Sequence, residues 1–163
     1  MVLDIGAGTS DYTILANGKM INETRDTVRK GGNNVQQRVN RALRAEGKSL
    51  NPAVVEAGVV FGQVKSGART VDITSHVRKA KAQVAEEIVS ELSASLQGIG
   101  YNLQDIEYLL VIGGGSLNGA TESISVPIVE NLRLQAPDLA SVSLPSDLNA
   151  RLMNVIGASI LAK

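Results

Sequence analysis

The sequence predicts an α/β fold in which short strands form a sheet covered by helices. Three observations predict this fold class. Residues 1–25 contain short apolar strands and the dipeptide Asn17-Gly18, which is typical of a tight hairpin turn. Residues 75–96 repeat apolar side chains at three- and four-residue steps, as an amphipathic helix does. Residues 108–112 form a continuous apolar run of the kind found in buried strands.

The N-terminal part predicts a small sheet unit. Strands are expected over residues 2–5, 12–16 and 19–25, with Asn17-Gly18 joining the last two. Gly31-Gly32 is expected to end this unit, because paired glycines favour a break in regular structure.

Two helices are expected next. The first has Asn33 or Asn34 as its capping residue and stops near Gly47. Its apolar face consists of Val35, Val39, Ala42 and Leu43. The second starts at Asn51-Pro52, a capping residue followed by a proline at the first helical position, and runs to about residue 64. Residues 69–73 alternate as a strand does.

The second half predicts a long helix and the buried strand over residues 108–112. The helix spans residues 75–96, and its apolar stripe consists of Val77, Ala80, Val84, Ile88, Leu92 and Leu96. Pro127 favours two helical pieces between residues 118 and 134, since an internal proline breaks a helix. A short strand over residues 142–144 and a final helix capped by Ser146 or Asp147 complete the chain.

Composition limits the function classes. The 163 residues suit one domain, and 16 basic and 16 acidic side chains give no net charge, which argues against direct binding of nucleic acid. The absence of cysteine excludes disulfides and thiolate metal sites and fits the cytoplasm. No apolar run approaches the roughly 18 residues of a membrane span. A strand and a glycine loop begin at Met1 with no element before them, so we expect a fragment or a split gene.

The segment from Asp4 to Asp11 carries the clearest chemical signal. It lies between two predicted strands, so its glycines form a hairpin bend and not the helix start of a Rossmann loop. Gly6 and Gly8 permit positive φ and let backbone N–H groups approach phosphate oxygens, and Thr9 adds a hydroxyl donor. Asp4 beside phosphates indicates a divalent cation such as Mg²⁺ between them. The alternative is a tight hairpin with no ligand.

Asp4-Ile5-Gly6-Ala7-Gly8-Thr9-Ser10-Asp11 resembles the second phosphate motif shared by actins, sugar kinases and heat-shock chaperones, Asp-x-Gly-x-Gly-Thr-x-Asp. The resemblance implies that Gly6, Gly8, Thr9 and Ser10 bind the β- and γ-phosphates. It implies catalytic roles for Asp4, which holds the metal's water shell, and for Asp11, which holds a second water.

Two further segments extend the resemblance. Gly113, Gly114, Gly115 and Ser116 follow the apolar strand and are similar to the adenosine motif of the same proteins, although a triple glycine alone also fits a structural loop. Residues 148–157 resemble the C-terminal helix of ParM-like actins, with Leu152 where glycine is usual. We assign this helix only a packing role.

The chain therefore resembles the second domain of actin-like ATPases, above all the ParM-like plasmid-segregation type. The resemblance implies a ribonuclease-H-like mixed sheet flanked by helices, with a body of residues 1–31 and 74–163 and a small inserted α/β subdomain of residues 32–73. It implies binding of ATP or GTP with Mg²⁺, and head-to-tail filaments for plasmid or phage DNA segregation with a DNA-bound adaptor. No segment matches the first phosphate motif, so the isolated chain is expected to lack ATPase activity.

Other readings remain open. Half of a small-molecule kinase or of a chaperone-like ATPase would share the same motifs, and a non-enzymatic interaction domain could retain them. Arg38, Arg41 and Arg44 form a basic stripe that could meet a neighbouring subunit but is expected to be solvated. Arg78, Lys79 and Lys81 lie near the start of the long helix, and the resemblance implies that a charged residue of this region can border the adenine, although a solvated face is the simpler expectation.

Overall fold

A five-stranded mixed sheet forms the centre of the molecule in the computed structural model, which describes residues 1–116, 119 and 121–142. The strand order is β5-β2-β1-β8-β9. β1 pairs antiparallel with β2 and parallel with β8, so the sheet changes direction at β1. The strands are β1 (Val2–Ile5), β2 (Ser10–Thr13), β5 (Asp26–Val28), β8 (Tyr108–Ile112) and β9 (Ala140–Val142). The predicted mixed sheet is confirmed, and β8 has the predicted bounds.

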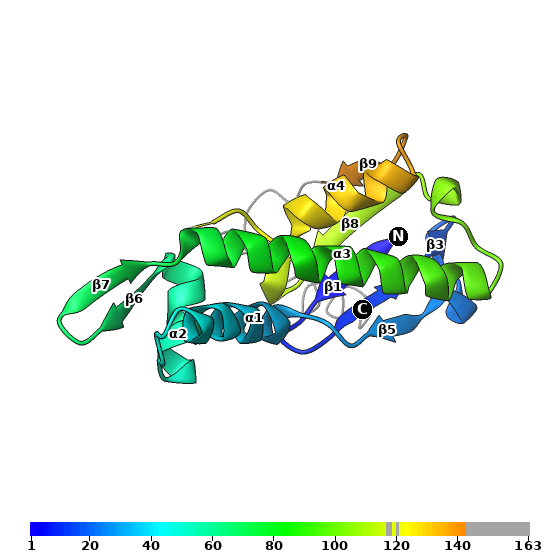
Figure 1. The fold of residues 1–163 in the computed structure, drawn as a ribbon. Helices are drawn as coiled ribbons and strands as arrows, with labels where there is room; N and C mark the ends of the chain where they lie inside the picture. The colour runs from blue at the N-terminus through cyan, green and yellow to red at the C-terminus, as the bar shows by residue number, and fades with distance from the viewer. Residues whose placement is uncertain (117–118, 120, 143–163) are drawn as a thin grey trace, which may run out of the picture.

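Helices flank this sheet. α3 (Thr74–Gly98) runs along most of the molecule, with α1 (Gly32–Ala45) and α4 (Ser125–Gln135) on either side of it (Figure 1). The predicted apolar stripe of α3 is buried throughout, and it packs in one core with Leu3 and Ile5 of β1. The long helix is therefore confirmed, because its apolar period placed one continuous face against the sheet.

Two small hairpins lie outside the main sheet. β3 (Leu15–Ala16) and β4 (Lys19–Met20) flank the predicted turn, where Asn17 and Gly18 have φ of 53° and 73°. These two positive angles are those of the turn type that Asn-Gly favours. β6 (Gln63–Ser66) and β7 (Arg69–Asp72) form a second hairpin that projects beyond the start of α3 (Figure 1). β7 confirms the strand expected over residues 69–73.

Two strand predictions near the N-terminus were wrong in extent. The strand expected over residues 12–16 is interrupted at Ile14, whose N–H donates to the Thr24 hydroxyl at 2.8 Å. The strand expected over residues 19–25 ends at Met20, and a 3₁₀ turn, η1 (Asn22–Thr24), follows. The buried Thr24 hydroxyl also donates to the Ile21 carbonyl, so a side chain replaces the ladder here. β5 was not predicted.

The first helices differ from expectation at their ends. Gly31, and neither Asn33 nor Asn34, is the N-cap of α1, although the Asn34 side chain accepts a hydrogen bond from the Gly31 N–H at 2.9 Å. α2 (Pro52–Phe61) begins as predicted, with the Asn51 side chain as its cap. It ends before residue 64, because the chain turns at Gly62 and enters β6.

Residues 32–73, the predicted insert, hold α1, α2, β6 and β7 and contribute no described strand to the main sheet. α1 nevertheless packs along α3 (Figure 1). The division into body and insert stays a prediction.

The C-terminal third is described only in part. Between residues 121 and 134 the described chain forms the single helix α4, with Pro127 in its first turn, instead of two pieces. β9 begins two residues before the expected strand, and residues 143–144 and the predicted final helix lie outside the described residues. Within the described part of the chain, no helix is long and apolar enough to cross a membrane.

Candidate functional site

The Asp4–Asp11 segment forms a hairpin loop, as the sequence predicts. Asp4 and Asp11 are directly opposite one another in the β1–β2 ladder, and Gly6 donates its N–H to the Thr9 carbonyl at 2.8 Å. Neither Gly6 nor Gly8 uses the positive φ that a glycine permits. A Cβ added at Gly8 would meet no atom within 4 Å, so neither backbone geometry nor packing among the described residues requires a glycine there.

The loop's carbonyl groups are held by the first turn of α1. Gly32 donates its N–H to the Gly6 carbonyl at 3.1 Å, and Asn33 donates to the Ala7 carbonyl at 2.7 Å. These two bonds satisfy oxygens that would repel an anion. The N–H groups of Ala7, Gly8 and Thr9 donate no hydrogen bond to any described residue. Successive unpaired N–H groups in a turn are a favourable arrangement for binding phosphate.

The second glycine segment lies beside this loop because β1 and β8 are parallel neighbours, with Asp4 opposite Ile112. Gly113 has a φ of 89°, and a Cβ there would overlap the Asp4 carboxylate and lie 2.6 Å from the Ile5 carbonyl oxygen. A Cβ on Gly115 would lie 3.0 Å from the same oxygen. Both glycines thus permit the close approach of the two segments. A Cβ at Gly114 would meet no described atom within 4 Å, and Ser116 ends the turn η3 (Gly114–Ser116).

The polar side chains of the first loop have unequal surroundings. Asp11 is exposed and accepts hydrogen bonds from the hydroxyl groups of Thr27, at 2.5 Å, and Thr9, at 3.4 Å. Asp4 is half-buried. Ser10 is fully buried and donates its hydroxyl to the Lys30 carbonyl at 2.8 Å, so that hydroxyl has a partner within the chain. The described residues contain no group of three or more His, Cys, Asp or Glu side chains suited to hold a metal.

A cavity of about 190 Å³ adjoins the second glycine segment. Its lining comes from α1, α2, α3 and the glycine turn and includes Gly32, Val60, Lys81, Gly114 and Gly115. Pockets that enclose a whole small ligand usually have about 300–1,000 Å³. The described cavity is therefore smaller than a site that encloses a whole small ligand.

Lys81 lines this cavity, although the sequence favoured a solvated position for it. Its ammonium group donates to the Thr121 hydroxyl at 2.7 Å and to the Glu122 carbonyl at 2.6 Å. Burial lowers the pKa of Lys81, and the charge of Glu122 opposes that shift. The available signal was its spacing: Lys81 lies four residues after Val77 and three before Val84, at the margin of the buried stripe of α3.

Comparison with known proteins identifies the fold. Residues 2–119 match the family model described as archaeal actin homologue MreB-like, C-terminal. No curated protein sequence matches. Among solved structures, Ta0583, an archaeal actin homologue, in complex with ADP has a TM-score of 0.77 at 17% identity, covering 99% of this chain and 48% of that one.

Two further solved structures are similar in fold. A non-polymerising mutant of MamK bound to AMPPNP has a TM-score of 0.62 at 23% identity, covering 88% of this chain and 49% of its own. A ParM from a 15-stranded filament of Clostridium botulinum has a TM-score of 0.65 at 14% identity, covering 98% and 45%. This chain thus spans less than half the length of the proteins it matches.

Proposed function

We propose that this chain, which belongs to the family of archaeal MreB-like actin homologues, C-terminal domain, is the nucleotide-binding half of an actin-like ATPase that forms filaments. One observation carries the proposal: two glycine segments, distant in sequence, meet at the end of β1 and β8, and one of them presents three N–H groups without acceptors among the described residues. The ADP and AMPPNP bound to similar proteins support a nucleotide as the ligand.

Different residues would bind different parts of the nucleotide. The N–H groups of the Gly6–Thr9 turn and the Thr9 hydroxyl would bind the β- and γ-phosphates, because donors aimed at anionic oxygens stabilise them without reorganisation. Gly114 and Gly115, with Ser116 beyond them, would bind the adenosine along the cavity that Lys81 borders. Ser10 would contribute only through its backbone, since its hydroxyl already bonds Lys30.

The two aspartates would act on water. Asp4, beside the phosphate turn, would hold the water shell of Mg²⁺, an ion that keeps several waters when protein carboxylates bind it. When bound, Mg²⁺ supplies charge that neutralises the phosphates during transfer. Asp11, oriented by its hydrogen bonds from Thr27 and Thr9, would hold a second water on the open side of the hairpin.

The activity of the whole protein is part of this proposal. A first domain would supply the remaining phosphate contacts, so the isolated chain should bind nucleotide weakly and hydrolyse none. The complete protein would form head-to-tail filaments in the cytoplasm, through residues 32–73 of one copy and the body of the next. ParM filaments support self-association, and the ParM likeness motivates a role in plasmid or phage DNA segregation with a DNA-bound adaptor.

Gly8→Val provides the direct test of the phosphate turn, with Gly98→Val as a matched control. At both positions an added Cβ meets no described atom within 4 Å, and neither glycine has a positive φ, so both variants should keep the parental unfolding midpoint. We expect Gly8→Val to lower the affinity for a fluorescent ATP analogue at least about tenfold, a loss of roughly 1.4 kcal/mol, and Gly98→Val to leave it unchanged. Parental affinity in Gly8→Val would refute the assignment.

The Asp4→Ala variant tests the role of the metal independently of the phosphate contacts. We expect Asp4→Ala to weaken nucleotide binding in Mg²⁺ and to match the parent in chelator, because only the water shell of the metal is lost. A deficit of equal size in both buffers would contradict the metal role.

In a complete protein that contains this chain, light scattering with ATP should reveal polymer. If no polymer forms, the kinase or chaperone reading replaces the filament.

A further inference from the structure

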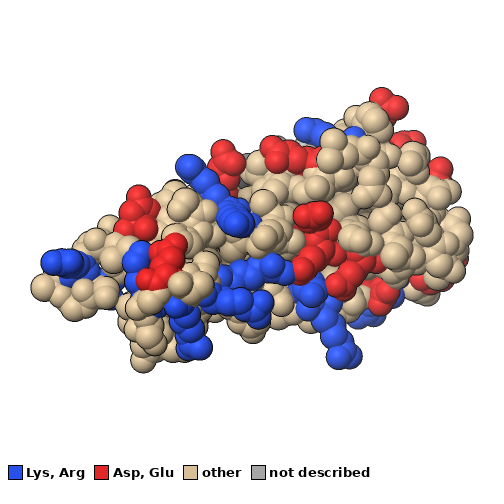
Figure 2. Space-filling view, in the orientation of Figure 1, with Lys and Arg blue, Asp and Glu red and all other residues tan. Residues whose placement is uncertain are grey.

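A groove on the outer side of the α1–α3 pair is not used by the proposed nucleotide site. It has a volume of about 600 Å³ and lies between the second half of α1 and the first turns of α3. Its floor includes Ala42, Ala45 and Ala80, and its walls include Arg41 and Lys79. In Figure 2, Lys and Arg side chains gather over α1 on this face, whereas Asp and Glu side chains gather farther along α3.

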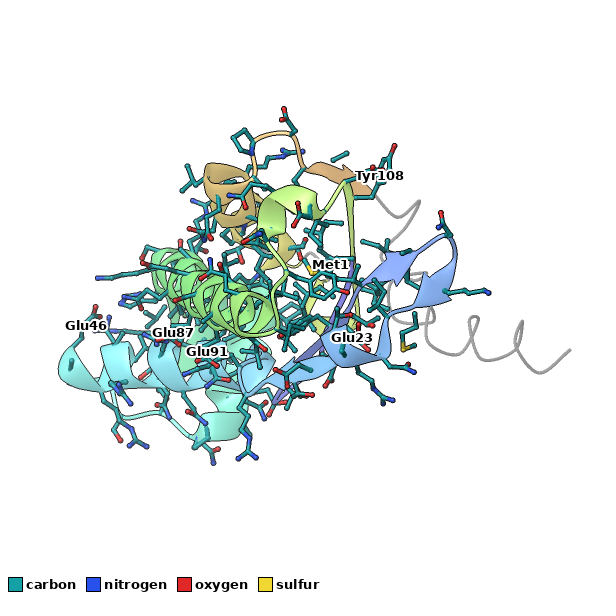
Figure 3. All side chains as sticks on the ribbon, turned by 90° about the vertical axis from the view of Figure 1, so that its right-hand side faces the viewer. Met1, Glu23, Glu46, Glu87, Glu91 and Tyr108 are labelled. Atoms are coloured by element: carbon teal, nitrogen blue, oxygen red, sulfur yellow. The ribbon has the colours of Figure 1, made fainter. Side chains whose placement is uncertain are left out.

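Both ends of the groove are fixed by ion pairs. At one end Arg38 of α1 donates to Gln83 at 3.2 Å and pairs with Glu87 of α3. At the other end Glu46 lies 2.6 Å from the His76 ring and 2.7 Å from the Lys48 ammonium. Figure 3 shows Glu46 and Glu87 on the side where α1 and α3 face each other. The two walls are thus held at a defined separation.

Between these ends the charge is uncompensated. Arg41 and Lys79 are exposed, and neither forms an ion pair with any residue in the described part of the chain. Glu46 is the only carboxylate in the lining, and it already pairs with the Lys48 ammonium and lies 2.6 Å from the His76 ring. The groove therefore presents positive charge to whatever enters it.

The shape of the groove favours a helix as its occupant. Alanines in the lining allow the backbone of a third helix to approach closely, because the distance between packed helices depends on the size of the side chains at their contact. The lining residues of α3 extend from Ser75 to Gln83, about 12 Å at 1.5 Å per residue, which corresponds to roughly two helical turns. Carboxylates on such a helix would reach the cationic walls on both sides.

We propose that this groove binds an acidic helical segment of a partner protein. A nucleic acid is disfavoured, because proteins that bind single strands use aromatic stacking platforms, and the groove lining contains no Phe, Tyr or Trp. The inference does not depend on nucleotide binding. None of the residues that carry it lies in the glycine segments or lines the cavity beside them.

The test uses the 163-residue chain and a fluorescein-labelled, Ala-rich peptide with Glu residues spaced to avoid i,i+4 pairs, capped at both ends and roughly 25 residues long, because isolated helices of about 15 residues or fewer are marginal in water. Fluorescence anisotropy is measured at about 0.1 M salt, where charges within about 10 Å still interact. A peptide of equal charge with central prolines reports binding without a helix, and a labelled oligo-dT reports binding of nucleic acid. Circular dichroism and thermal unfolding confirm that each protein variant is folded.

The decisive comparison is between two double variants with the same change in net charge. Arg41→Glu with Lys79→Glu reverses the groove walls, and we expect at least about tenfold weaker peptide binding because two complementary charge pairs become repulsive. Lys65→Glu with Arg69→Glu, on the β6–β7 hairpin, should change the affinity less than about threefold through the net charge alone.

A third variant tests the shape of the groove. Ala45→Leu leaves the charge unchanged and fills the exposed part of the floor, so it should weaken binding of the helical peptide only. Equal losses in the two double variants would overturn the proposal, as would equal binding of the helical and proline-containing peptides. Tighter binding of oligo-dT through Arg41 and Lys79 would assign the surface to nucleic acid instead.

Discussion

Replacing Gly113 with alanine should destabilise the protein strongly, because this position combines two separate costs. Its φ of 89° lies in the left-handed region, where a residue with a Cβ loses about 1–2 kcal/mol. The new methyl group would overlap the Asp4 carboxylate and lie 2.6 Å from the Ile5 carbonyl oxygen and 2.9 Å from the Ile5 nitrogen. Overpacking of this kind typically costs about 1–3 kcal/mol more.

The expected loss is therefore about 2–5 kcal/mol of unfolding free energy. At about 2–4 °C per kcal/mol for a chain of this size, a loss of about 3 kcal/mol lowers the midpoint by roughly 6–12 °C. Thermal and urea unfolding followed by circular dichroism measure it. Gly114→Ala is the control, since its Cβ meets no atom within 4 Å. If Gly113→Ala unfolded within about 0.5 kcal/mol of the parent, as exposed substitutions usually do, the close approach of the two glycine segments would be wrong.

Three further outcomes follow from single side chains. Ile88→Ala, at a fully buried position of α3, should cost about 2–5 kcal/mol in urea unfolding, whereas Leu134→Ala, at a position 82% exposed, should cost less than about 0.5 kcal/mol. Burial tends to raise the pKa of Glu87, but hydrogen bonds, chiefly from Arg38, outweigh it and lower the pKa below the usual 4.5. Glu87→Gln should therefore be less stable than the parent at neutral pH. This difference in stability should disappear as the pH falls below 4.5 through the lowered pKa of Glu87, and unfolding curves recorded at a series of pH values measure it. Asn51→Ala should cost about 1 kcal/mol, measured in the same way, because the Asn51 side chain caps α2; no loss would show that the cap contributes nothing.

Local sequence patterns predicted those elements that are specified by residues close together in the chain. The stripe of α3 repeats over its whole length, β8 is uniformly apolar, and Asn17-Gly18 specifies a turn by its own backbone preference. The loop from Asp4 to Asp11 was also recognisable as a candidate site, because its residue types and spacing match the phosphate motif that it resembles. The start of α2 followed from Asn51-Pro52 for the same reason, since a cap acts on the next few N–H groups.

Elements that depend on distant partners were not predictable in this way. β5 is a strand because β2 offers it an edge, and the chain breaks at Ile14 because the Thr24 hydroxyl takes its N–H. β6 replaces the end of the predicted second helix because β7 pairs with it. Such pairings depend on which backbone groups meet in space, and short apolar runs carry no information about that.

The same distinction between local pattern and tertiary contact applies to the candidate site. The sequence by itself determined that two glycine segments and two aspartates are present, because their chemistry belongs to the residues and their spacing. Only the tertiary structure decided that Gly113 lies against Asp4, that α1 occupies the carbonyls of Gly6 and Ala7, and that Lys81 borders a cavity. The physical reason is that a residue's type fixes which bonds it can form, whereas the parallel pairing of β1 with β8 and the packing of α1 on α3 fix which partners lie within reach.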